Sequence, residues 1–525
     1  MNFISFEFVA FLIVTVVLYY LVPKKTQWIL LLLANIAFYC FGGFRTVGYL
    51  VFTTLTTWGA GLLLDRMNAH KKAIDKTDKV ALEKNKKERK AVVAVTLVLN
   101  FGMLFMLKYL GFTVETAEKF VGLFGVQASI SVPDFVLPLG VSFYIFQSTG
   151  YVIDMYRGKY PAQHNIAKFS LFTSFFPQMV EGPISRYDKL GVQLTEYHPL
   201  NTDNIRDGIL IIMWGYFKKM VIADRAAVVV SSFFAEYWTH SGSVIAFSIL
   251  MYCINLYCDF SGGIDITVGA AKLLGIELEE NFRRPLFSRS LTDYWRRWHI
   301  TLGGWMRDYV FYPLSLSKPF GRLGKWAREK IGGKAGKIFA TSAATFIVYL
   351  IIGIWHGANF RYIAFGFYNG IIITSSLLLA GPYNTLKTKL KINEDCRLWH
   401  FFQTIRTCFI VFIGRYITKS PRLLTAIWLI INTFKPSTFA PGNLFDGTLL
   451  TFGLTLTDLI IVFACTVFMH AVEFYEEKRG SVIEALSNKN GFVQWGAMTV
   501  LMLLIVFFGI MRGGYISSEF IYKAF

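Results

Sequence analysis

The sequence predicts an all-α, polytopic transmembrane protein, and three observations lead to this fold class. Hydrophobic residues make up 54% of the 525 residues and charged residues only 17%, a balance that suits a lipid-embedded chain. Apolar runs long enough to cross the roughly 30 Å hydrocarbon core recur along the whole chain. Lys and Arg, which give a formal net charge of +19, fall mainly in the short segments between these runs. This distribution orients a membrane protein and argues against nucleic-acid binding.

The apolar runs are spaced so that about eleven of them can cross the membrane, all within one domain that covers residues 1–525. Three runs fill residues 3–64. The first carries Glu7, has no basic residue before it and shows no cleavage site of small residues. We therefore expect a retained first span rather than a cleaved signal. The later runs occupy residues 92–110, 137–156, 205–230, 243–256, 346–370, 401–417, 426–434, 454–474 and 495–511.

The most charged segment of the chain, residues 66–90, sets the expected orientation. Its lysines and arginines place it in the cytoplasm under the positive-inside tendency. Counting back three crossings puts the N-terminus outside, and the same count puts Lys24 and Lys25 on the cytoplasmic side. The sequence thus predicts a multi-pass protein of the inner, cytoplasmic membrane.

One moderately apolar segment, residues 169–187 with the sequence FSLFTSFFPQMVEGPISRY, is interrupted in its middle. Pro177 and Pro183 disturb helical hydrogen bonding, and Gln178 and Glu181 are polar at membrane depth. Irregular backbone is tolerated at that depth only where protein or water surrounds it, so a broken or re-entrant segment is expected. An ordinary interfacial loop is the alternative.

Polar residues gather in residues 259–316, which are too polar for a simple set of spans. This density in an otherwise apolar chain suggests a wet chamber that handles a substrate. The polar residues are Asp259, Asp265, Asn281, Arg283, Arg284, Arg289, Asp293, Arg296, Arg297, His299, Arg307 and Asp308.

Within this stretch we predict a helix over residues 290–305, because its first four residues, SLTD, form a capping box. Trp295 and His299 are four residues apart and would share one side of that helix, while Arg296 and Arg297 would lie around it. One surface could then meet a cavity and another an anionic group. The alternative is an amphipathic interfacial helix whose arginines reach lipid phosphates.

The apolar run at residues 346–370 contains the triplet Trp355-His356-Gly357. An imidazole inside a membrane segment is a functional-site candidate, although a histidine at a helix end can equally hydrogen-bond a neighbouring helix. Two such histidines, His299 and His356, suit transfer of an acyl group to a hydroxyl. One neutral imidazole can accept the hydroxyl proton, and the second polar group can orient it or stabilise the developing oxyanion. Residue chemistry alone does not name this reaction.

The cysteines are scattered, mostly within apolar segments, and lack the spacing of metal ligands. We therefore expect small core residues or unpaired thiols, with neither a disulfide framework nor a metal site. The six are Cys40, Cys253, Cys258, Cys396, Cys408 and Cys465.

Several ordered segments resemble the signature blocks of the membrane-bound O-acyltransferase (MBOAT) family. They span a core of about residues 138–370 and are PLGVSFYIFQ, FFPQMVEGPISRY, DFSGGIDITVGAAKLLGIELEENFRRPLFSRSLTDYWRRWHITLGGWMRDYVFYPL and GIWHGANF. Within the family, the chain is most similar to the bacterial branch of the alginate O-acetyltransferase membrane subunit. The resemblance implies the fold of this family, with re-entrant or interfacial helices among the spans.

The resemblance also implies a catalytic site, in which the family's catalytic histidine corresponds to His356 and its second motif histidine to His299. It implies a funnel in which an acyl thioester, acetyl-CoA or an acylated carrier protein, enters from the cytoplasm and the acceptor hydroxyl arrives from outside. No tightly bound cofactor is expected. No nucleophilic Ser or Cys stands beside His356, so direct attack by the acceptor is the expected route. The candidate residues for binding substrate and donor are Trp355, Trp295, Arg296, Arg297, Asp293, Gln178 and Glu181.

We therefore expect a membrane O-acyltransferase that moves an acyl group, with acetyl preferred, to a hydroxyl of a cell-envelope or exported polysaccharide. Transfer is direct or passes through an extracellular SGNH-type acyltransferase or esterase, and membrane lipids are further partners. One alternative is D-alanyl transfer from a carrier protein to teichoic acid. An alternative of another class is a transporter or flippase whose polar chamber conducts a solute.

Overall fold

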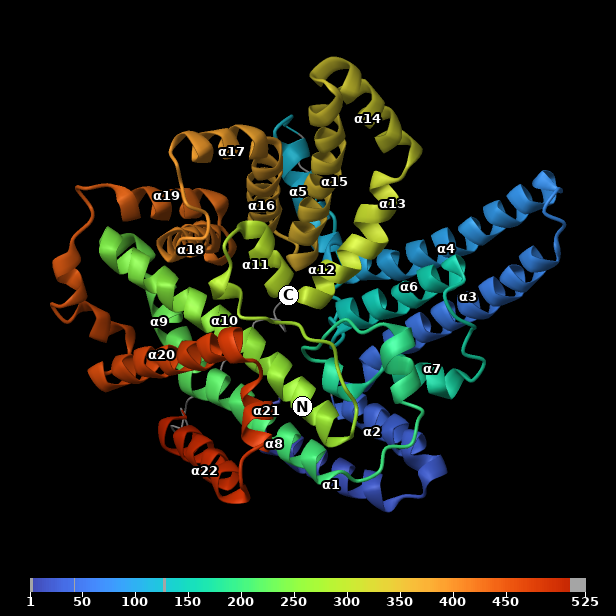
Figure 1. Cartoon of the computed structure of the whole chain (residues 1–525), viewed down its shortest axis with the longest axis horizontal. Helices are drawn as coiled ribbons and strands as arrows, with labels where there is room; N and C mark the ends of the chain where they lie inside the picture. The colour runs from blue at the N-terminus through green and yellow to red at the C-terminus, as the bar shows by residue number, and fades with distance from the viewer. Residues whose placement is uncertain (1–2, 42, 126–128, 510–525) are drawn as a thin grey trace. The chain divides into compact units, whose positions relative to one another are not determined.

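The computed structural model describes residues 3–41, 43–125 and 129–509, and every regular element within them is helical (Figure 1). The only extended pairing in these residues is an isolated antiparallel bridge between Phe282 and Trp298. The predicted all-α class is therefore confirmed for the described part of the chain.

The chain folds as two compact units, each of which is described by itself. Unit one comprises Met1–Ile212 and Gly263–Glu279, and unit two comprises Met213–Gly262 and Glu280–Phe525. The single domain predicted over residues 1–525 stays a prediction. Two helices contribute residues to both units, namely α8 (Thr202–Tyr216) and α10 (Gly242–Leu273).

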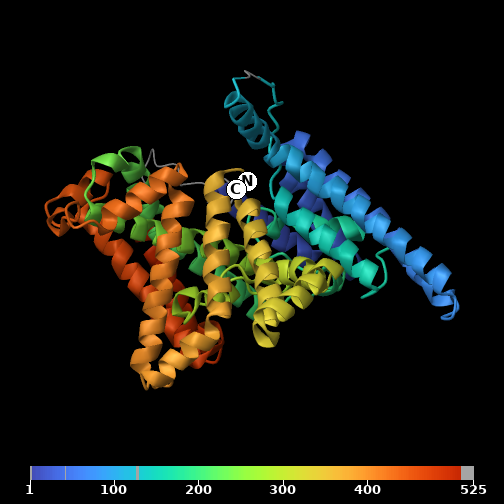
Figure 2. The same cartoon turned by 90° about the horizontal axis from the view of Figure 1, so that it is seen from above.

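Unit one is built around α3 (Val47–Ala73), which packs against α4 (Lys79–Lys108) and α6 (Val141–Arg157). Gly61 on α3 lies against the Tyr151 ring of α6, where a Cβ would come 2.6 Å from the ring carbon Cε1. Figures 1 and 2 both show α3 and α4 running side by side, with the charged segment 66–90 at their joined ends. The other helices of this unit are α1 (Phe6–Leu21), α2 (Gln27–Phe41), α5 (Leu110–Gly122) and α7 (Ile166–Thr173).

Unit two contains a tight helical hairpin, α15 (Gly333–His356) and α16 (Phe360–Leu378). Gly353 and Gly366 face each other in it, and a Cβ on Gly366 would lie 3.1 Å from the Gly353 Cα. Small residues let helices approach closely where lipid supplies no hydrophobic drive between them. The remaining helices are α9 (Asp224–Ala235), α11 (Leu291–Arg297), α12 (Ile300–Met306), α13 (Tyr312–Ser315), α14 (Lys318–Ile331), α17 (Ala380–Lys389), α18 (Arg397–Lys419), α19 (Leu423–Phe434), α20 (Leu456–Arg479), α21 (Val482–Ser487) and α22 (Gly491–Phe508).

Six helices among the described residues are long and apolar enough to cross a membrane, and a bent pair, α16 with α17, would make a seventh. The predicted eleven crossings are not confirmed by this count. Several apolar runs form helices such as α1 and α19, which fall short of the about 20 residues that a straight crossing needs. The six are Val47–Ala73, Lys79–Lys108, Gly242–Leu273, Ile338–His356, Leu456–Arg479 and Gly491–Phe508.

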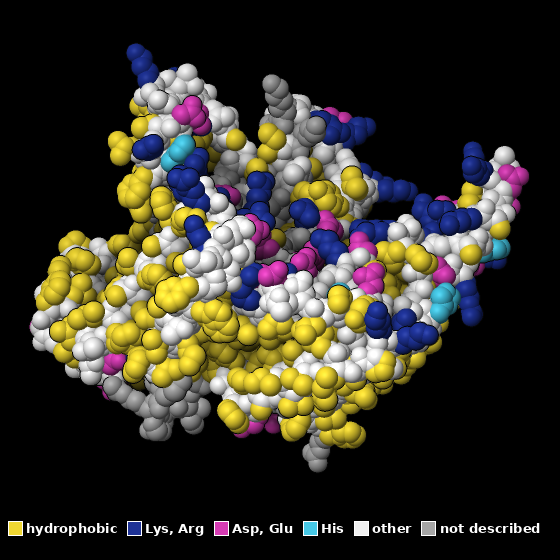
Figure 3. Space-filling view, turned by 60° about the horizontal axis from the view of Figure 1, so that its bottom comes forward, with side chains coloured by type: hydrophobic (Ala, Val, Ile, Leu, Met, Phe, Trp, Pro, Cys, Tyr) yellow, Lys and Arg dark blue, Asp and Glu magenta, His cyan; other side chains and the backbone are white. Residues whose placement is uncertain are grey.

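Large apolar side chains remain on the surface, as the extensive yellow area of Figure 3 illustrates. On α22 no residue is buried, and Phe492, Trp495 and Phe507 are 89%, 70% and 73% exposed. Monomeric soluble proteins rarely expose so much contiguous apolar surface. Together with the apolar helices, this surface identifies a multi-pass membrane protein.

The segment predicted to be broken, residues 169–187, is interrupted within unit one. α7 ends before a short 3-10 turn at Phe176–Gln178, and the following residues are irregular, yet residues 171–185 are all buried. Side chains replace the missing helical bonds. The Phe176 N–H donates to Oδ1 of Asn35 over 2.9 Å, and the Thr267 hydroxyl donates to the Pro177 carbonyl over 2.9 Å. This enclosure favours the broken segment over an exposed loop.

Candidate active site

The first candidate side chain, His356, is the last residue of α15 and lies where the chain turns into α16. The side-chain oxygen of Asn359 accepts the Arg361 N–H over 3.0 Å and caps the second helix. Gly357 lies against the Tyr362 ring, where a Cβ would come 2.6 Å from the ring carbon Cε2. A glycine at this position therefore lets the turn pack tightly beside the histidine.

Aromatic rings frame the imidazole of His356. The ring centroid of Trp355 lies 5.1 Å from it, and those of Phe365 and Tyr362 lie 6.2 and 6.4 Å away. A low-dielectric surrounding of this kind strengthens any hydrogen bond that the imidazole makes to a substrate.

The helix predicted over residues 290–305 is not continuous, and that prediction is wrong. α11 (Leu291–Arg297) ends in an extended residue, Trp298, and α12 (Ile300–Met306) begins after His299. His299 has a φ of +49°, in the left-handed region that non-glycine residues seldom adopt. Strained positions of this kind cluster at functional sites.

The break arises because the preceding segment pairs with it. The Arg283 N–H donates to the Arg297 carbonyl over 2.9 Å, and the Ile300 N–H donates to the Asn281 carbonyl over 3.0 Å. These antiparallel bonds satisfy backbone groups on both sides of His299 that a continuous helix would have paired internally. The sequence pattern favoured a helix, and a contact distant in sequence overrode it.

His299 is buried, at 1% exposed, and reaches the surroundings of the other histidine. Its Nδ1 lies 3.2 Å from the Asn281 side-chain oxygen, and its ring lies 5.0 Å from Phe260 and 5.8 Å from Trp355. Burial, followed by the charge of the nearby His356, holds the pKa of His299 well below its usual range. The two predicted histidines are therefore brought together around Trp355, and His299 is neutral at physiological pH.

Trp295 belongs to the group of aromatic side chains around His356. Because the helix breaks at Trp298 and His299, Trp295 and His299 do not share a helix face. Its indole N–H donates to Oδ1 of Asn369 over 3.1 Å, and its ring lies 5.7 Å from Tyr349 and 6.1 Å from Phe365. Phe365 also contacts His356. Trp295 thus lines the same aromatic cluster through α16.

The predicted capping box is half formed. The Ser290 hydroxyl accepts the Asp293 N–H over 3.1 Å and caps α11, as predicted. The Asp293 carboxylate, however, accepts the Arg289 N–H over 3.2 Å and the Arg297 Nε–H over 3.2 Å. Asp293 therefore organises the start of α11, which accounts for its presence without a substrate contact.

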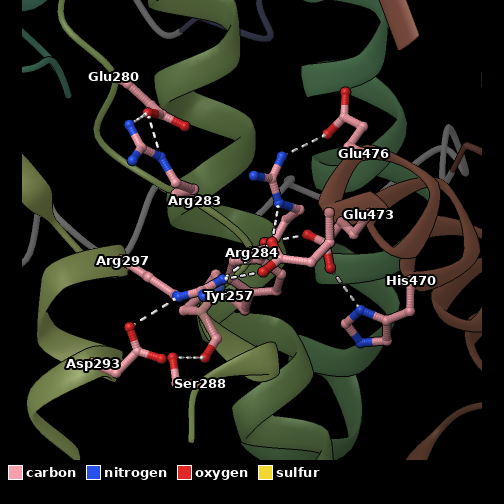
Figure 4. Close-up of polar contacts among 12 residues, drawn as sticks. Tyr257, Glu280, Arg283, Arg284, Ser288, Asp293, Arg297, His470, Glu473 and Glu476 are labelled. Atoms are coloured by element: carbon pink, nitrogen blue, oxygen red, sulfur yellow. Dashed lines mark hydrogen bonds and ion pairs between the residues drawn. The ribbon is translucent and has the colours of Figure 1, made fainter. Parts of the chain in front are cut away.

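The two neighbouring arginines of α11 differ in their partners. Arg297 donates to Glu477 of α20 over 3.0 Å. It also donates to Asp293 on its own helix (Figure 4). Arg284 reaches the same helix, with its Nε 2.8 Å from Glu477 and its Nη1 3.7 Å from Glu476. The charge of Arg297 is thus already balanced by carboxylates.

Arg296 is exposed, and no ion pair of its guanidinium occurs among the described residues. Its positive charge acts electrostatically on Tyr349 of α15, which also contacts Trp295. Of the two arginines, Arg296 is the one left available for an anionic ligand.

Gln178 and Glu181 belong to unit one, whereas both histidines belong to unit two. The Gln178 amide donates to the Pro183 carbonyl over 2.8 Å and to Oγ of Ser185 over 2.6 Å. Glu181 is 0% exposed, and its carbonyl accepts the Thr267 hydroxyl over 2.5 Å. These hydrogen bonds stabilise the broken segment.

Sequence reasoning missed Arg415 of α18. This buried side chain donates from Nη2 to the Tyr294 hydroxyl over 2.7 Å and lies over the Trp298 ring, 5.1 Å from its centroid. It therefore braces α11 from the side of α18. A guanidinium inside an apolar run was the available indication, since such a charge needs a partner.

A polar cluster on α20 was also missed. Nδ1 of His470 lies 2.8 Å from Oε2 of Glu473, and the Tyr257 hydroxyl bonds the same carboxylate (Figure 4). The ring planes of Tyr257 and His470 are nearly parallel, at 9°. His470 thus has its hydrogen-bond partner on its own helix, three residues ahead.

The described residues contain no group of three or more His, Cys, Asp or Glu side chains placed to hold a metal ion. All six cysteines fall among them and are free thiols.

These features define a polytopic membrane protein in which two imidazoles, the buried His299 and the partly exposed His356, meet around Trp355. The model of the membrane-bound O-acyltransferase family matches residues 161–328, a segment that includes His299 and ends before His356.

Known proteins extend this match along the chain. "Probable alginate O-acetylase AlgI" of Pseudomonas aeruginosa is 30% identical over 469 residues, covering 89% of this chain and 81% of that protein. "Peptidoglycan O-acetyltransferase" of Helicobacter pylori is 30% identical over 46% of this chain and 47% of its own length. "Teichoic acid D-alanyltransferase" of Bacillus subtilis is 27% identical over 45% of this chain and 58% of its own length. The chain belongs to the membrane-bound O-acyltransferase family and is an acyltransferase.

Proposed function

We propose that this protein transfers an acetyl group from a cytoplasmic thioester to a hydroxyl of a cell-envelope or exported polysaccharide. The observation that carries the proposal is the pair of histidines, His299 and His356, on either side of Trp355. The names of the relatives support the acceptor class, since they refer to alginate and peptidoglycan O-acetylation. Transfer is direct or passes through an extracellular SGNH-type partner.

In this mechanism His356 is the general base. Its imidazole takes the proton of the acceptor hydroxyl while the hydroxyl oxygen attacks the thioester carbonyl carbon. The tetrahedral intermediate collapses, the carbon–sulfur bond breaks, and the proton passes from His356 to the leaving thiolate. His299 orients the reacting groups. No Ser or Cys side chain is needed as a nucleophile, because the acceptor itself attacks.

The donor is acetyl-CoA or an acylated carrier protein, a co-substrate rather than a bound cofactor. Arg296 is proposed to contact a phosphate of the donor, since it is exposed and unengaged by carboxylates among the described residues. Trp295 and Trp355 are proposed to line the path to the reacting carbonyl. The assignment of Gln178 and Glu181 to substrate binding stays a prediction.

The same proposal includes the topology derived from charge. About eleven crossings, an inner-membrane location and an N-terminus outside are supported by the basic segment 66–90 and the recurring apolar runs. Two helices of this segment, α3 and α4, carry its charges at their joined ends.

Mass spectrometry of envelope polymers tests the function. Cells that carry the wild-type protein are expected to contain O-acetylated polysaccharide, and cells with His356→Ala are expected to lose it. His164→Ala is the matched control, because that side chain is 76% exposed and lies in unit one. Correct membrane insertion of each variant is checked by its yield in the membrane fraction. Unchanged acetylation with His356→Ala would contradict the catalytic assignment.

The same samples discriminate two other functions. Transfer of D-alanine to teichoic acid would show as alanyl ester on that polymer, a result suggested by the name of the Bacillus subtilis relative. A transporter or flippase would move a solute without consuming a thioester, so purified protein in vesicles would show flux and no acyl turnover.

A further inference from the structure

We propose that Asn281 is a positioning residue of the active site, whose side-chain oxygen fixes His299 in the tautomer that carries its hydrogen on Nδ1. The predicted effects on acyl transfer rest on the proposed function. The tautomer itself can be measured without any substrate.

The orientation of the Asn281 amide follows from its contacts with Thr301. The Thr301 backbone N–H, which can only donate, lies 3.1 Å from the side-chain atom assigned as Oδ1. The Thr301 hydroxyl lies 2.8 Å from the same atom. A flipped amide would set its NH₂ group against the backbone N–H, with two donors facing each other. The atom that faces Thr301 is therefore the oxygen.

The same oxygen sets the protonation of the imidazole. It lies 3.2 Å from Nδ1 of His299, and an amide oxygen can only accept a hydrogen bond. Nδ1 must therefore carry hydrogen. A neutral imidazole holds a single N–H, so the lone pair of His299 is on Nε2.

Asn281 also controls where the ring stands. Its backbone carbonyl accepts the Ile300 N–H over 3.0 Å, on the far side of the left-handed residue His299. The neighbouring Phe282 ring packs 5.0 Å from Trp298. Backbone and side chain of Asn281 thus hold both the bend and the tautomer of His299.

The side-chain nitrogen of Asn281 indicates that this residue does more than stabilise the fold. The side chain is 1% exposed, and Nδ2 has no hydrogen-bond partner among the described residues. Burying an amide donor without a partner is unfavourable, so a purely structural role would select a residue without that group. We infer that the Asn281 amide keeps this orientation because its Oδ1 must face Nδ1 of His299.

The tautomer separates two roles that the sequence left open. With its lone pair on Nε2, neutral His299 can accept a hydrogen bond from the acceptor hydroxyl and so orient it. Its Nε2 cannot donate to the oxyanion of the tetrahedral intermediate. The structure thus assigns His299 to hydroxyl positioning rather than to oxyanion stabilisation.

NMR of the purified protein in nanodiscs, with selectively ¹⁵N-labelled histidine, measures the tautomer directly. The resonances of His299 are identified by their loss in His299→Gln. Wild-type protein is expected to show hydrogen on Nδ1, and Asn281→Ala is expected to shift His299 towards the Nε2–H form. Hydrogen on Nε2 in the wild type, or an unchanged tautomer in Asn281→Ala, would overturn the proposal.

Activity provides a second readout with acetyl-CoA as the probe. Asn281→Ala is expected to slow acyl transfer at least about tenfold, because the lone pair no longer faces the hydroxyl. Asn281→Asp keeps an acceptor and so keeps the Nδ1–H tautomer. Its carboxylate favours the imidazolium of His299, whose titration is also coupled to His356. The acid limb of its pH–rate profile should therefore move to higher pH, with activity recovering as pH rises.

Asn255→Ala is the matched control, because Asn255 is another buried asparagine of unit two and donates to the Ala223 carbonyl over 2.9 Å. It is expected to lose stability while keeping the His299 tautomer and the pH profile. If Asn281→Ala does not fold, the Asn281→Asp profile decides, and an unshifted acid limb would contradict the proposal. Absence of acyl transfer by wild-type protein would refute the proposed function and leave the tautomer result standing.

Discussion

His299 and His356 meet around one tryptophan, yet different interactions hold them. His356 ends a long helix and is framed by aromatic rings and by a glycine turn, so its place depends on packing. His299 lies at a strained break between two short helices, and its Nδ1 is hydrogen-bonded to the side-chain oxygen of Asn281. Packing determines where an imidazole stands, whereas hydrogen bonding also determines which nitrogen carries the proton. We therefore expect the two sites to respond differently to substitution.

Removing the imidazoles should give the largest effect. His356→Ala is expected to lower kcat by about 10² to 10⁴-fold, the range typical of a lost general base. His299→Ala is expected to cost less, about 10- to 100-fold, because it loses hydroxyl positioning but keeps the base. Since the two act on one proton transfer, the double variant should be little slower than His356→Ala. Steady-state kinetics on purified protein measures all three, and strictly multiplicative losses would show that the histidines work separately.

The packing side of the comparison is tested at Gly357. Gly357→Ala is expected to lower activity about tenfold or more, because the added Cβ meets the Tyr362 ring and displaces His356. Tyr362→Ala in the same chain should restore part of the loss by making room. Kinetics and thermal unfolding of the single and double variants provide the measurement. An active Gly357→Ala protein with wild-type stability would mean that the turn adapts without moving the histidine.

The two arginines of α11 should separate binding from stability. Arg296→Gln is expected to raise KM for an anionic thioester by about tenfold, with little change in stability, because it removes a charge-assisted contact. Arg297→Gln is expected to leave KM unchanged and to lower stability by about 1 kcal/mol, since its half-buried partner Glu477 loses a hydrogen bond. Raised salt should mimic the first variant. The reverse pattern would place the donor phosphate at Arg297.

The smallest effect is expected at the hydrogen bond between Trp295 and Asn369. Asn369→Leu leaves the part-buried indole N–H of Trp295 without its acceptor, at a cost of about 1 kcal/mol in stability and a few-fold in activity. Trp295→Phe removes the donor, so adding Asn369→Leu to it should cost little more. A double-variant cycle of unfolding midpoints measures this coupling. Additive losses would show that the bond does not position the aromatic cluster.

Much of the fold and of the site could be predicted from polarity. The apolar runs predicted an all-helical membrane protein, and the interrupted run with Pro177 predicted a buried break. His299 and His356 stood out because polar groups are costly in such a chain. The ordered motifs, rather than the physics of any one residue, pointed from these two histidines to acyl transfer.

The remaining features depend on contacts between residues distant in sequence. The spacing of Trp295 and His299 fits a helix, and only the bonds of Asn281 and its neighbours to residues 297–301 reveal the break. Likewise, Arg297 pairs with Glu477, a residue 180 positions later. No local periodicity encodes such a partner. The sequence could show that these charges needed neutralisation, but not which groups provide it.

The carboxylates of Glu476 and Glu477 on α20 limit how far this protein can be truncated. Arg284 and Arg297 flank the histidine-bearing break, and both are neutralised by Glu477, far outside the recognisable motif core of residues 138–370. A fragment trimmed to that core would retain both histidines but would leave Arg284 without its carboxylate partners and Arg297 with Asp293 alone. Such a fragment should misassemble rather than act as a minimal enzyme. Truncation series and chimaeras of this protein should therefore keep α20 together with the segment from Asn281 to Met306.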